Sequence, residues 1–283
     1  VNNSFEKNKY LVKLGDSIEV TLPEPQALDV KPQNIPIDIF YEDEDLIIVN
    51  KPQGMVVHPG AGNYENTLVN ALLYHCHGKL SSINGVIRPG IVHRIDKDTS
   101  GLIMIAKNNF THQSLAAQLK DHSITRKYHA IATGNIKESK ITIDVPIGRH
   151  PVDRLKMTAI QSGRNAITHV MVLDVFKDYS YIEARLETGR THQIRVHMDF
   201  IGHPLFNDDR YGGDRVVKGT LYSKYKKFIH NCFDLLPRHA LHAKTLGFIH
   251  PRSKEKMFFE NEIPDDFKQV IEKWRSFSSF STQ

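Results

Sequence analysis

Short apolar segments, each bounded by turn-forming or charged residues, recur along the central part of the sequence. Residues 46–49 (Leu-Ile-Ile-Val) and 101–106 (Gly-Leu-Ile-Met-Ile-Ala) are continuous apolar runs of the length that buried strands have. Further runs with strand-like spacing lie at 126–133, 140–145, 166–176 and 181–186. In the last of these, apolar side chains at 182, 184 and 186 alternate with Tyr, Glu and Arg, which predicts a sheet with one solvent-facing side.

Two segments have helical spacing instead. From Asn109 to Asp121 the apolar residues fall on one helical face, and either Asn109 or Thr111 can cap the start of this helix. A second helix of about eleven residues is predicted from an N-cap at Thr191 to a terminating glycine at Gly202. Because strands outnumber helices and do not alternate with them, the pattern predicts an α+β fold with a mixed, mainly antiparallel β-sheet core and flanking helices and loops.

Three segments are predicted along the chain. Residues 1–22 end with the alternation Ile18, Val20 and Leu22 after a Leu-Gly-Asp turn, which predicts a short strand at the end of a small module. Four prolines follow within residues 23–36, so we expect 23–37 to be an extended linker. The main domain then spans residues 38–283.

Composition narrows the class of protein. The chain has 283 residues, of which 40% are hydrophobic and 24% charged, and no apolar run approaches the ~18 residues that span a bilayer. A membrane protein is therefore not expected. The two cysteines, Cys76 and Cys232, cannot form a disulfide framework or a four-cysteine metal cluster. With no charged and apolar leader at the N-terminus, a reducing, cytoplasmic location is predicted.

Positive charge is concentrated in one part of the sequence. The formal net charge is +5, from 37 Lys and Arg against 32 Asp and Glu. Residues 88–128 hold seven Lys and Arg and three Asp, so a local net charge of +4 accounts for most of the excess. A solvated basic face and a nucleic-acid surface both fit this pattern, and the neighbouring motifs favour the second.

The densest polar cluster in an apolar frame is HRIDKDTSG at residues 93–101. An EF-hand would need a bidentate Glu at the position of Lys107, and a kinase catalytic loop would need Asp directly after His-Arg, where Ile95 stands. These departures exclude calcium binding and kinase chemistry. For this segment alone, a purely structural turn capped by Asp96 and Asp98 stays open.

A second cluster, ETGRTHQIRVHM at residues 187–198, follows a predicted strand and opens the second predicted helix, with Arg195 in its first turns. His192 and His197 are five residues apart, which does not fit the i, i+4 spacing of two zinc ligands on a helix. The His-Cys-His at 75–77 has no second ligand pair at zinc-site spacing. We therefore predict no metal site.

A third element is Arg126-Lys127-Tyr128 at the start of a predicted strand. On a strand, Tyr128 shares a face with Ala130 and Ala132, whose small side chains leave room above the ring. One interpretation is a tyrosine that packs in the core. A tyrosine beside two cations is also what stacking on a nucleobase near a phosphate backbone requires.

Four motifs occur in order along the chain: KPQGM and VHP within residues 51–59, HRIDKDTSGL at 93–102, RKY at 126–128 and GRTHQIRVH at 189–197. Together they resemble the RluA/RluD family of RNA pseudouridine synthases. The resemblance spans residues 38–250 and implies the pseudouridine synthase fold for that region. Residues 1–22 resemble the tail of an S4-type RNA-binding module, so a partial S4-like module is expected ahead of the catalytic domain.

The resemblance implies isomerisation of uridine to pseudouridine in structured RNA, with large-subunit (23S-type) ribosomal RNA as the expected target, after the base is flipped out. It implies that Asp96 is the catalytic carboxylate, that Arg195 pairs with it and that Tyr128 contacts the base. An arginine within about 4–6 Å keeps a partly buried aspartate ionised, and its planar guanidinium can grip the carboxylate bidentately. Because the reaction involves no hydride, phosphoryl or redox step, no metal or organic cofactor is expected.

RNA is the expected partner, and basic side chains are expected to hold it. Arg94 would hold the duplex after the uridine leaves it, and lysines and arginines would contact phosphates in a salt-sensitive way. The predicted RNA-binding residues are Arg94, Lys97, Lys107, Arg126, Lys127, Arg190 and His192. We expect a monomer with no obligate protein partner.

Several alternatives stay open on the sequence alone. A tRNA-directed pseudouridine synthase fits the same motifs, because nothing in them recognises a base sequence. A non-catalytic RNA-binding or ribosome-assembly protein could retain the fold, although the intact Asp96, Tyr128 and Arg195 argue against it. A metal-dependent hydrolase that uses the 16 histidines is a further alternative. One carboxylate could attack the sugar, attack the pyrimidine ring or remove a sugar proton, so no mechanism is selected.

Overall fold

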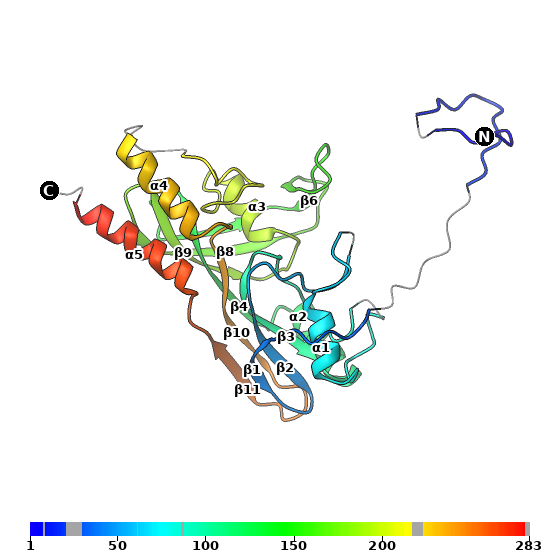
Figure 1. The fold of residues 1–283 in the computed structure, drawn as a ribbon, viewed down its shortest axis with the longest axis horizontal. Helices are drawn as coiled ribbons and strands as arrows, with labels where there is room; N and C mark the ends of the chain where they lie inside the picture. Colours follow the sequence, from blue (N-terminus) through cyan, green and yellow to red (C-terminus); the bar gives the residue numbers. More distant parts are fainter. Residues whose placement is uncertain (8, 21–29, 61, 86–87, 217–222, 281–283) are drawn as a thin grey trace.

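A large β-sheet forms the frame of the molecule, and helices lie against it (Figure 1). The computed structural model describes residues 1–7, 9–20, 30–60, 62–85, 88–216 and 223–280. The strands of the large sheet are β1 (Asp38–Glu42), β2 (Leu46–Lys51), β3 (Ser100–Ala106), β4 (Thr125–Thr133), β5 (Lys140–Asp144), β8 (Ile167–Val175), β9 (Tyr179–Leu186), β10 (Leu241–Ile249) and β11 (Lys256–Glu260). Within the described ranges they follow the order β1-β2-β3-β10-β4-β9-β8-β5, with β11 also paired to β10.

A short hairpin and five helices complete the described part of the chain. The hairpin consists of β6 (Ile147–Arg149) and β7 (Met157–Ala159). The helices are α1 (Leu68–His75), α2 (Asn109–Lys120), α3 (Gln193–Phe200), α4 (Ser223–Leu235) and α5 (Asp265–Phe280). In Figure 1, α4 and α5 lie together at one end of the sheet, and α1 and α2 lie at the other.

Strand β10 joins the two halves of the large sheet. It pairs in parallel with β3 through His242 and Ala243, and antiparallel with β4 and β11. This close approach requires Gly101, which has φ +112°, because a Cβ there would lie 2.3 Å from the Ala243 carbonyl oxygen. The other pairs within the large sheet, as far as it is described, are antiparallel. The predicted α+β fold with a mixed, mainly antiparallel sheet is confirmed.

The sheet is buried on both faces in its first half. Alternate residues of β2 and β3 contribute to two apolar clusters, one shared with α1 and α3 and the other with α2. Burial on both faces explains why these two strands read as continuous apolar runs. A further cluster packs α4 and α5 against β9 around Tyr179 and Trp274, whose ring centroids are 4.4 Å apart.

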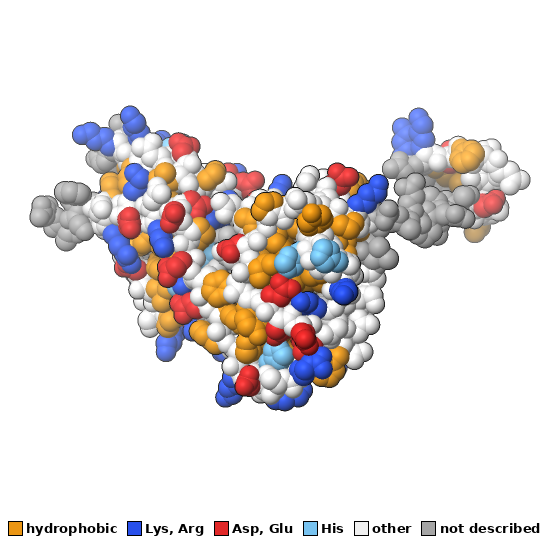
Figure 2. All heavy atoms as spheres, turned by 60° about the horizontal axis from the view of Figure 1, so that its bottom comes forward, with side chains coloured by type: hydrophobic (Ala, Val, Ile, Leu, Met, Phe, Trp, Pro, Cys, Tyr) orange, Lys and Arg blue, Asp and Glu red, His pale blue; other side chains and the backbone are white. Residues whose placement is uncertain are grey.

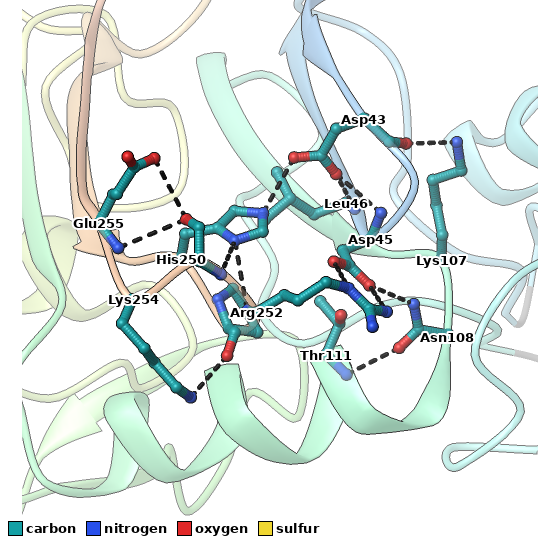
Figure 3. Close-up of polar contacts among 12 residues, drawn as sticks. Asp43, Asp45, Leu46, Lys107, Asn108, Thr111, His250, Arg252, Lys254 and Glu255 are labelled. Carbon is teal, nitrogen blue, oxygen red and sulfur yellow. Dashed lines mark hydrogen bonds and ion pairs between the residues drawn. The ribbon is translucent and has the colours of Figure 1, made fainter.

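A polar network joins the turn between β1 and β2, the turn after β10 and the start of α2 (Figure 3). It lies at the ends of β2 and β10 that are opposite Lys51 and Leu241. Asp43, in the turn after β1, pairs with His250, in the turn after β10, at 2.9 Å. Asp45 pairs bidentately with Arg252 at 2.6 and 2.7 Å and accepts a hydrogen bond from Asn108 at the start of α2. These contacts fix two hairpin turns relative to the helix whose other end reaches the site described below.

Both predicted helices are formed, but their N-cap residues differ from the predicted ones. Neither Asn109 nor Thr111 caps α2; the N-cap is Asn108, whose Oδ1 accepts a backbone N–H of the first turn at 2.9 Å. Helix α3 has eight residues rather than about eleven. His192 occupies its N-cap position in the left-handed conformation (φ +56°), so Thr191 is not the cap.

The predicted strand at residues 18–22 is not formed where the chain is described. Ile18 and Val20 are exposed and lie outside strands, so they gain none of the apolar burial that stabilises a strand. Residues 21–29, which include Leu22 and the first part of the predicted linker at 23–37, lie outside the described residues. The S4-like module therefore stays a prediction.

Two further observations concern the apolar character of the described helices and the distribution of charge on one face of the molecule. In the described part of the chain, no helix combines the length and apolar character needed to cross a bilayer. On the face shown in Figure 2, Lys and Arg side chains are interspersed with Asp, Glu and apolar side chains. No large patch of positive charge covers the described residues of that face.

Candidate active site

A cavity of about 490 Å³ lies where the loop before β3 meets the loop before α3. Its wall includes residues of the last turns of α2 and of the first half of β4. This volume falls in the range of pockets that bind small ligands. The polar clusters recognised near residues 93–101, 126–128 and 187–198 therefore converge on one site.

Asp96 and Arg195 meet in this cavity, although they are 99 residues apart. Asp96 lies in the loop before β3, and Arg195 lies in the first turn of α3. Arg195 Nη1 donates to Asp96 Oδ2 at 3.0 Å. The side chain of Arg195 is 6% exposed and that of Asp96 is 16% exposed, so the carboxylate faces the cavity while the guanidinium is enclosed. The expected contact is present.

A second carboxylate holds Arg195 from its other side. Asp208 is fully buried and accepts hydrogen bonds from Arg195 Nε at 2.7 Å and Nη2 at 2.9 Å. The guanidinium also lies 5.0 Å from the centroid of the Tyr211 ring. Arg195 is thus fixed by two carboxylates and an aromatic ring before any ligand binds.

The pair is ionised at neutral pH. Burial acts to raise the pKa of Asp96, but the charge of the Arg195 guanidinium and its hydrogen bond hold that pKa below its usual value. Burial acts to lower the pKa of Arg195, and the hydrogen bonds and charges of Asp208 and Asp96 raise it further above its ordinary range. Asp96 is therefore a carboxylate that stays charged in a nearly enclosed pocket.

Tyr128 forms part of the cavity wall. It lies on the buried face of β4 with Ala130 and Ala132, as the strand pattern predicted. Burial raises the pKa of its hydroxyl group against the opposing charge of Arg126, so the phenol is protonated at neutral pH. The ring can contact a planar base, and the hydroxyl group can donate a hydrogen bond.

His192 borders Asp96 in a defined protonation state. Its Nε2 lies 3.9 Å from Asp96 Oδ1, and its Nδ1 lies 2.9 Å from the Tyr211 hydroxyl oxygen. That oxygen already accepts the backbone N–H of Met157 at 3.0 Å, so its own proton is free to go to Nδ1. Burial lowers the pKa of His192, which favours the neutral ring, and a hydrogen bond donated by the Tyr211 hydroxyl group to Nδ1 would leave the ring N–H on Nε2, the nitrogen nearest Asp96.

The structure brings some of the predicted RNA-binding residues to the cavity and leaves others outside. Arg94, Arg126, Arg190 and His192 line it. Lys97, Lys107 and Lys127 do not. Lys107 pairs with Glu42 at 2.8 Å and Lys127 with Glu183 at 3.1 Å, while the Lys97 side chain is exposed. Roles for all seven residues stay predictions.

The loop that carries Asp96 is anchored from behind by polar side chains. Lys51 is fully buried, and its Nζ donates to three carbonyl oxygens, including that of Lys97 at 2.9 Å. Thr99 bonds with His239 at 2.8 Å, and Ser100 bonds with His242 at 2.8 Å. These anchors fix the backbone on both sides of Asp96.

Sequence reasoning missed these supporting residues, with one partial exception. Lys51 stands in a motif that was recognised, but without an assigned role. Asp208, Tyr211 and His239 lie in stretches with no local signal, because each acts on a partner far away in the chain. Arg88 and Lys120 also line the cavity, and their membership of the basic stretch was the available signal.

The arrangement offers acid–base and electrostatic chemistry rather than metal coordination. Among the described residues, no three His, Cys, Asp or Glu side chains gather as metal ligands. His192 bonds with Tyr211, whereas His197 bonds with Thr168. An ionised carboxylate, a fixed guanidinium and a tyrosine in one cavity suit reaction on a flipped-out base or its sugar.

Comparison with known proteins shows the family of the chain. Residues 45–200 match the family model described as RNA pseudouridylate synthase. The chain is 50% identical to the Bacillus subtilis protein "Uncharacterized RNA pseudouridine synthase YlyB", over 97% of this chain and 85% of that protein. It is 51% identical to "Ribosomal large subunit pseudouridine synthase D" of Zymomonas mobilis, over 93% of this chain and 80% of that protein.

Solved structures show the same fold. "Human RNA Pseudouridylate Synthase Domain Containing 1" superposes with a TM-score of 0.62 at 25% identity, covering 89% of this chain and 91% of that one. "Human RNA Pseudouridylate Synthase Domain Containing 4" gives a TM-score of 0.64 at 23% identity, covering 84% and 93%. The chain therefore belongs to the RNA pseudouridylate synthase family and is an isomerase that forms pseudouridine in RNA.

Proposed function

We propose that this protein converts specific uridines of large-subunit ribosomal RNA to pseudouridine, with Asp96 as the reacting carboxylate. The observation that carries the role of Asp96 is its contact with Arg195 at 3.0 Å inside the cavity. Relatives named ribosomal large subunit pseudouridine synthase D, at 42–51% identity, support the ribosomal target. A ribosomal RNA substrate supports the predicted cytoplasmic location.

The isomerisation breaks the bond between C1′ of the ribose and N1 of uracil and forms a bond between C1′ and C5. The hydrogen of C5 leaves to solvent, and N1 ends with a hydrogen in its place, so no electrons enter or leave. Asp96, kept ionised by Arg195, supplies the charged group that acts on the nucleoside. Asp208 prevents the guanidinium from turning away when the carboxylate engages the substrate.

The uridine must leave its stack to reach Asp96, which costs a few kcal/mol. Tyr128 in the cavity wall would contact the flipped base. Arg94 is exposed at the cavity, where it could hold the position that the base vacates. Contacts of this kind offset the cost of flipping.

Basic side chains would bind RNA phosphates, which contribute affinity without recognising sequence. The affinity for RNA is therefore expected to fall steeply between about 50 and 200 mM salt. An affinity that does not change with salt would contradict this part of the proposal.

Release of tritium from RNA labelled at C5 of uridine tests the function, because isomerisation frees that hydrogen and binding alone does not. Ribosomal RNA and tRNA from cells that lack the protein are the two substrates. We expect release from large-subunit ribosomal RNA. Release only from tRNA would reassign the target, and RNA binding without release would indicate a non-catalytic protein.

A further inference from the structure

Arg126 is a buried cation without a carboxylate partner. Three arginines of the described chain are at least nine-tenths buried, namely Arg126, Arg195 and Arg238. Arg195 pairs with two aspartates and Arg238 with Asp266, but Arg126 has no ion pair among the described residues. Its Nη2 donates to the Glu187 carbonyl oxygen at 3.3 Å, and its Nε has no partner.

An unpaired buried charge is costly, so its placement needs an explanation. The guanidinium forms part of the cavity wall, beside Gly189. A Cβ at Gly189 would lie 2.9 Å from Arg126 Nη1, so a glycine at that position leaves space for the guanidinium. The chain thus accommodates a charged group at the cavity instead of neutralising it.

The cavity around Arg126 is lined by more positive than negative side chains, which favours binding of an anion. Asp96 is the one carboxylate among the described residues that line the cavity, and it pairs with Arg195 rather than with Arg126. Arg88, Arg94, Lys120 and Arg190 line the same cavity and add further positive charge. The anionic group that an RNA substrate carries is its phosphodiester.

The position of Arg126 selects which phosphodiester it can reach. Arg126 and Tyr128 are two residues apart on one face of β4, a separation of about 6.6 Å along a strand. Tyr128 stands beside Asp96 in the cavity, so an anion at Arg126 lies within about one nucleotide of the reacting atoms. We propose that Arg126 binds the phosphodiester attached to the flipped uridine itself. This inference rests on the proposed function.

The first test compares Arg126→Met with Arg185→Met. Arg185 is an exposed arginine of β9 that lies outside the cavity wall, so it controls for the loss of one positive charge. We expect Arg126→Met to weaken ribosomal RNA binding about ten-fold and to reduce the slope of log affinity against log salt by about one. Arg185→Met should leave the affinity nearly unchanged. Because Arg126→Met removes a buried unpaired charge, it should unfold at the same urea concentration as the wild type or a higher one.

The second test locates the phosphate. Once pseudouridine mapping has identified the target, a short RNA is prepared with one neutral methylphosphonate linkage at that uridine, or at a linkage several nucleotides away. If Arg126 binds the phosphate at the target, Arg126→Met weakens binding of the unmodified and distally modified RNAs about ten-fold, but has little effect on the RNA modified at the target.

Two outcomes would overturn the inference. One is the same ten-fold loss on all three RNAs, which would show that Arg126 binds elsewhere on the strand. The other is unchanged affinity and salt slope with slower isomerisation in a single turnover, which would place Arg126 against the uracil ring. Failure of the proposed function is distinguishable, because the wild-type protein would then release no tritium, while the affinities of Arg126→Met and Arg185→Met for ribosomal RNA could still be compared.

Discussion

Arg195 stands between two carboxylates, and removing their charges one at a time separates catalysis from stability. Asp208→Asn takes away the fully buried partner that accepts two hydrogen bonds, at 2.7 and 2.9 Å. The enclosed guanidinium then keeps only Asp96 as a charged partner. Breaking a buried ion pair from one side costs about 3–5 kcal/mol, a large part of the 5–15 kcal/mol by which domains are typically stable.

Asp96→Asn should behave differently. Arg195 keeps both of its hydrogen bonds to Asp208, and the amide oxygen of Asn can still accept the bond from Nη1. The substitution also relieves the cost of holding a carboxylate in a nearly enclosed site. We expect the free energy of unfolding to change by less than about 1 kcal/mol, with turnover abolished and RNA affinity within several-fold of the wild type.

Urea unfolding followed by tryptophan fluorescence measures the stability of both variants. Trp274 is the one tryptophan of the chain, and it lies on α5, buried against α4 and β9, so it reports loss of the fold rather than a change at the site. Tritium release measures turnover. Equal destabilisation by the two substitutions, or substantial turnover in Asp96→Asn, would refute the reasoning.

Three further substitutions test the frame around the site. Gly101→Ala should cost about 3 kcal/mol of stability in urea unfolding, because φ is +112° and the new Cβ would lie 2.3 Å from the Ala243 carbonyl oxygen. Burial lowers the pKa of His242 to about 4, so the stability it contributes is complete above pH 6.5 and is lost as the pH falls towards 4. His242→Asn should therefore flatten the dependence of unfolding free energy on pH by about 1.4 kcal/mol per unit within that window. Tyr211→Phe keeps the ring beside Arg195 but removes the hydroxyl group that orients His192, so kcat should fall several-fold with little change in KM.

Each of these expectations has a result that contradicts it. Wild-type stability in Gly101→Ala would mean that β3 and β10 do not approach as closely as described. An unchanged pH slope in His242→Asn would mean that the imidazole is not held neutral by burial. An unchanged kcat in Tyr211→Phe, or a ¹⁵N spectrum in which the His192 tautomer is the same as in the wild type, would remove the role of the hydroxyl group.

Much of the fold could be recognised in the sequence because its signals are local. Strands β2 and β3 are continuous apolar runs because both of their faces are buried. In β4 and β9 the apolar residues are spaced as in a strand, with every second side chain on the same face. Strand β1, the β6–β7 hairpin and the region after residue 202 were not predicted. There, apolar spacing is ambiguous, and packing against distant elements selects the conformation.

The sequence by itself determined the family, the strand-rich fold class and the candidate pair of Asp96 and Arg195, because each depends on residue types in a short ordered pattern. Tertiary structure alone decided that Asp208 holds Arg195, that the Tyr211 hydroxyl group bonds with His192, and that Arg126 is buried without a carboxylate partner among the described residues. An aspartate or arginine in a sequence has the same charge whether it is solvated or enclosed. Only the folded chain fixes its burial and its distant partners, and these decide how strongly that charge acts.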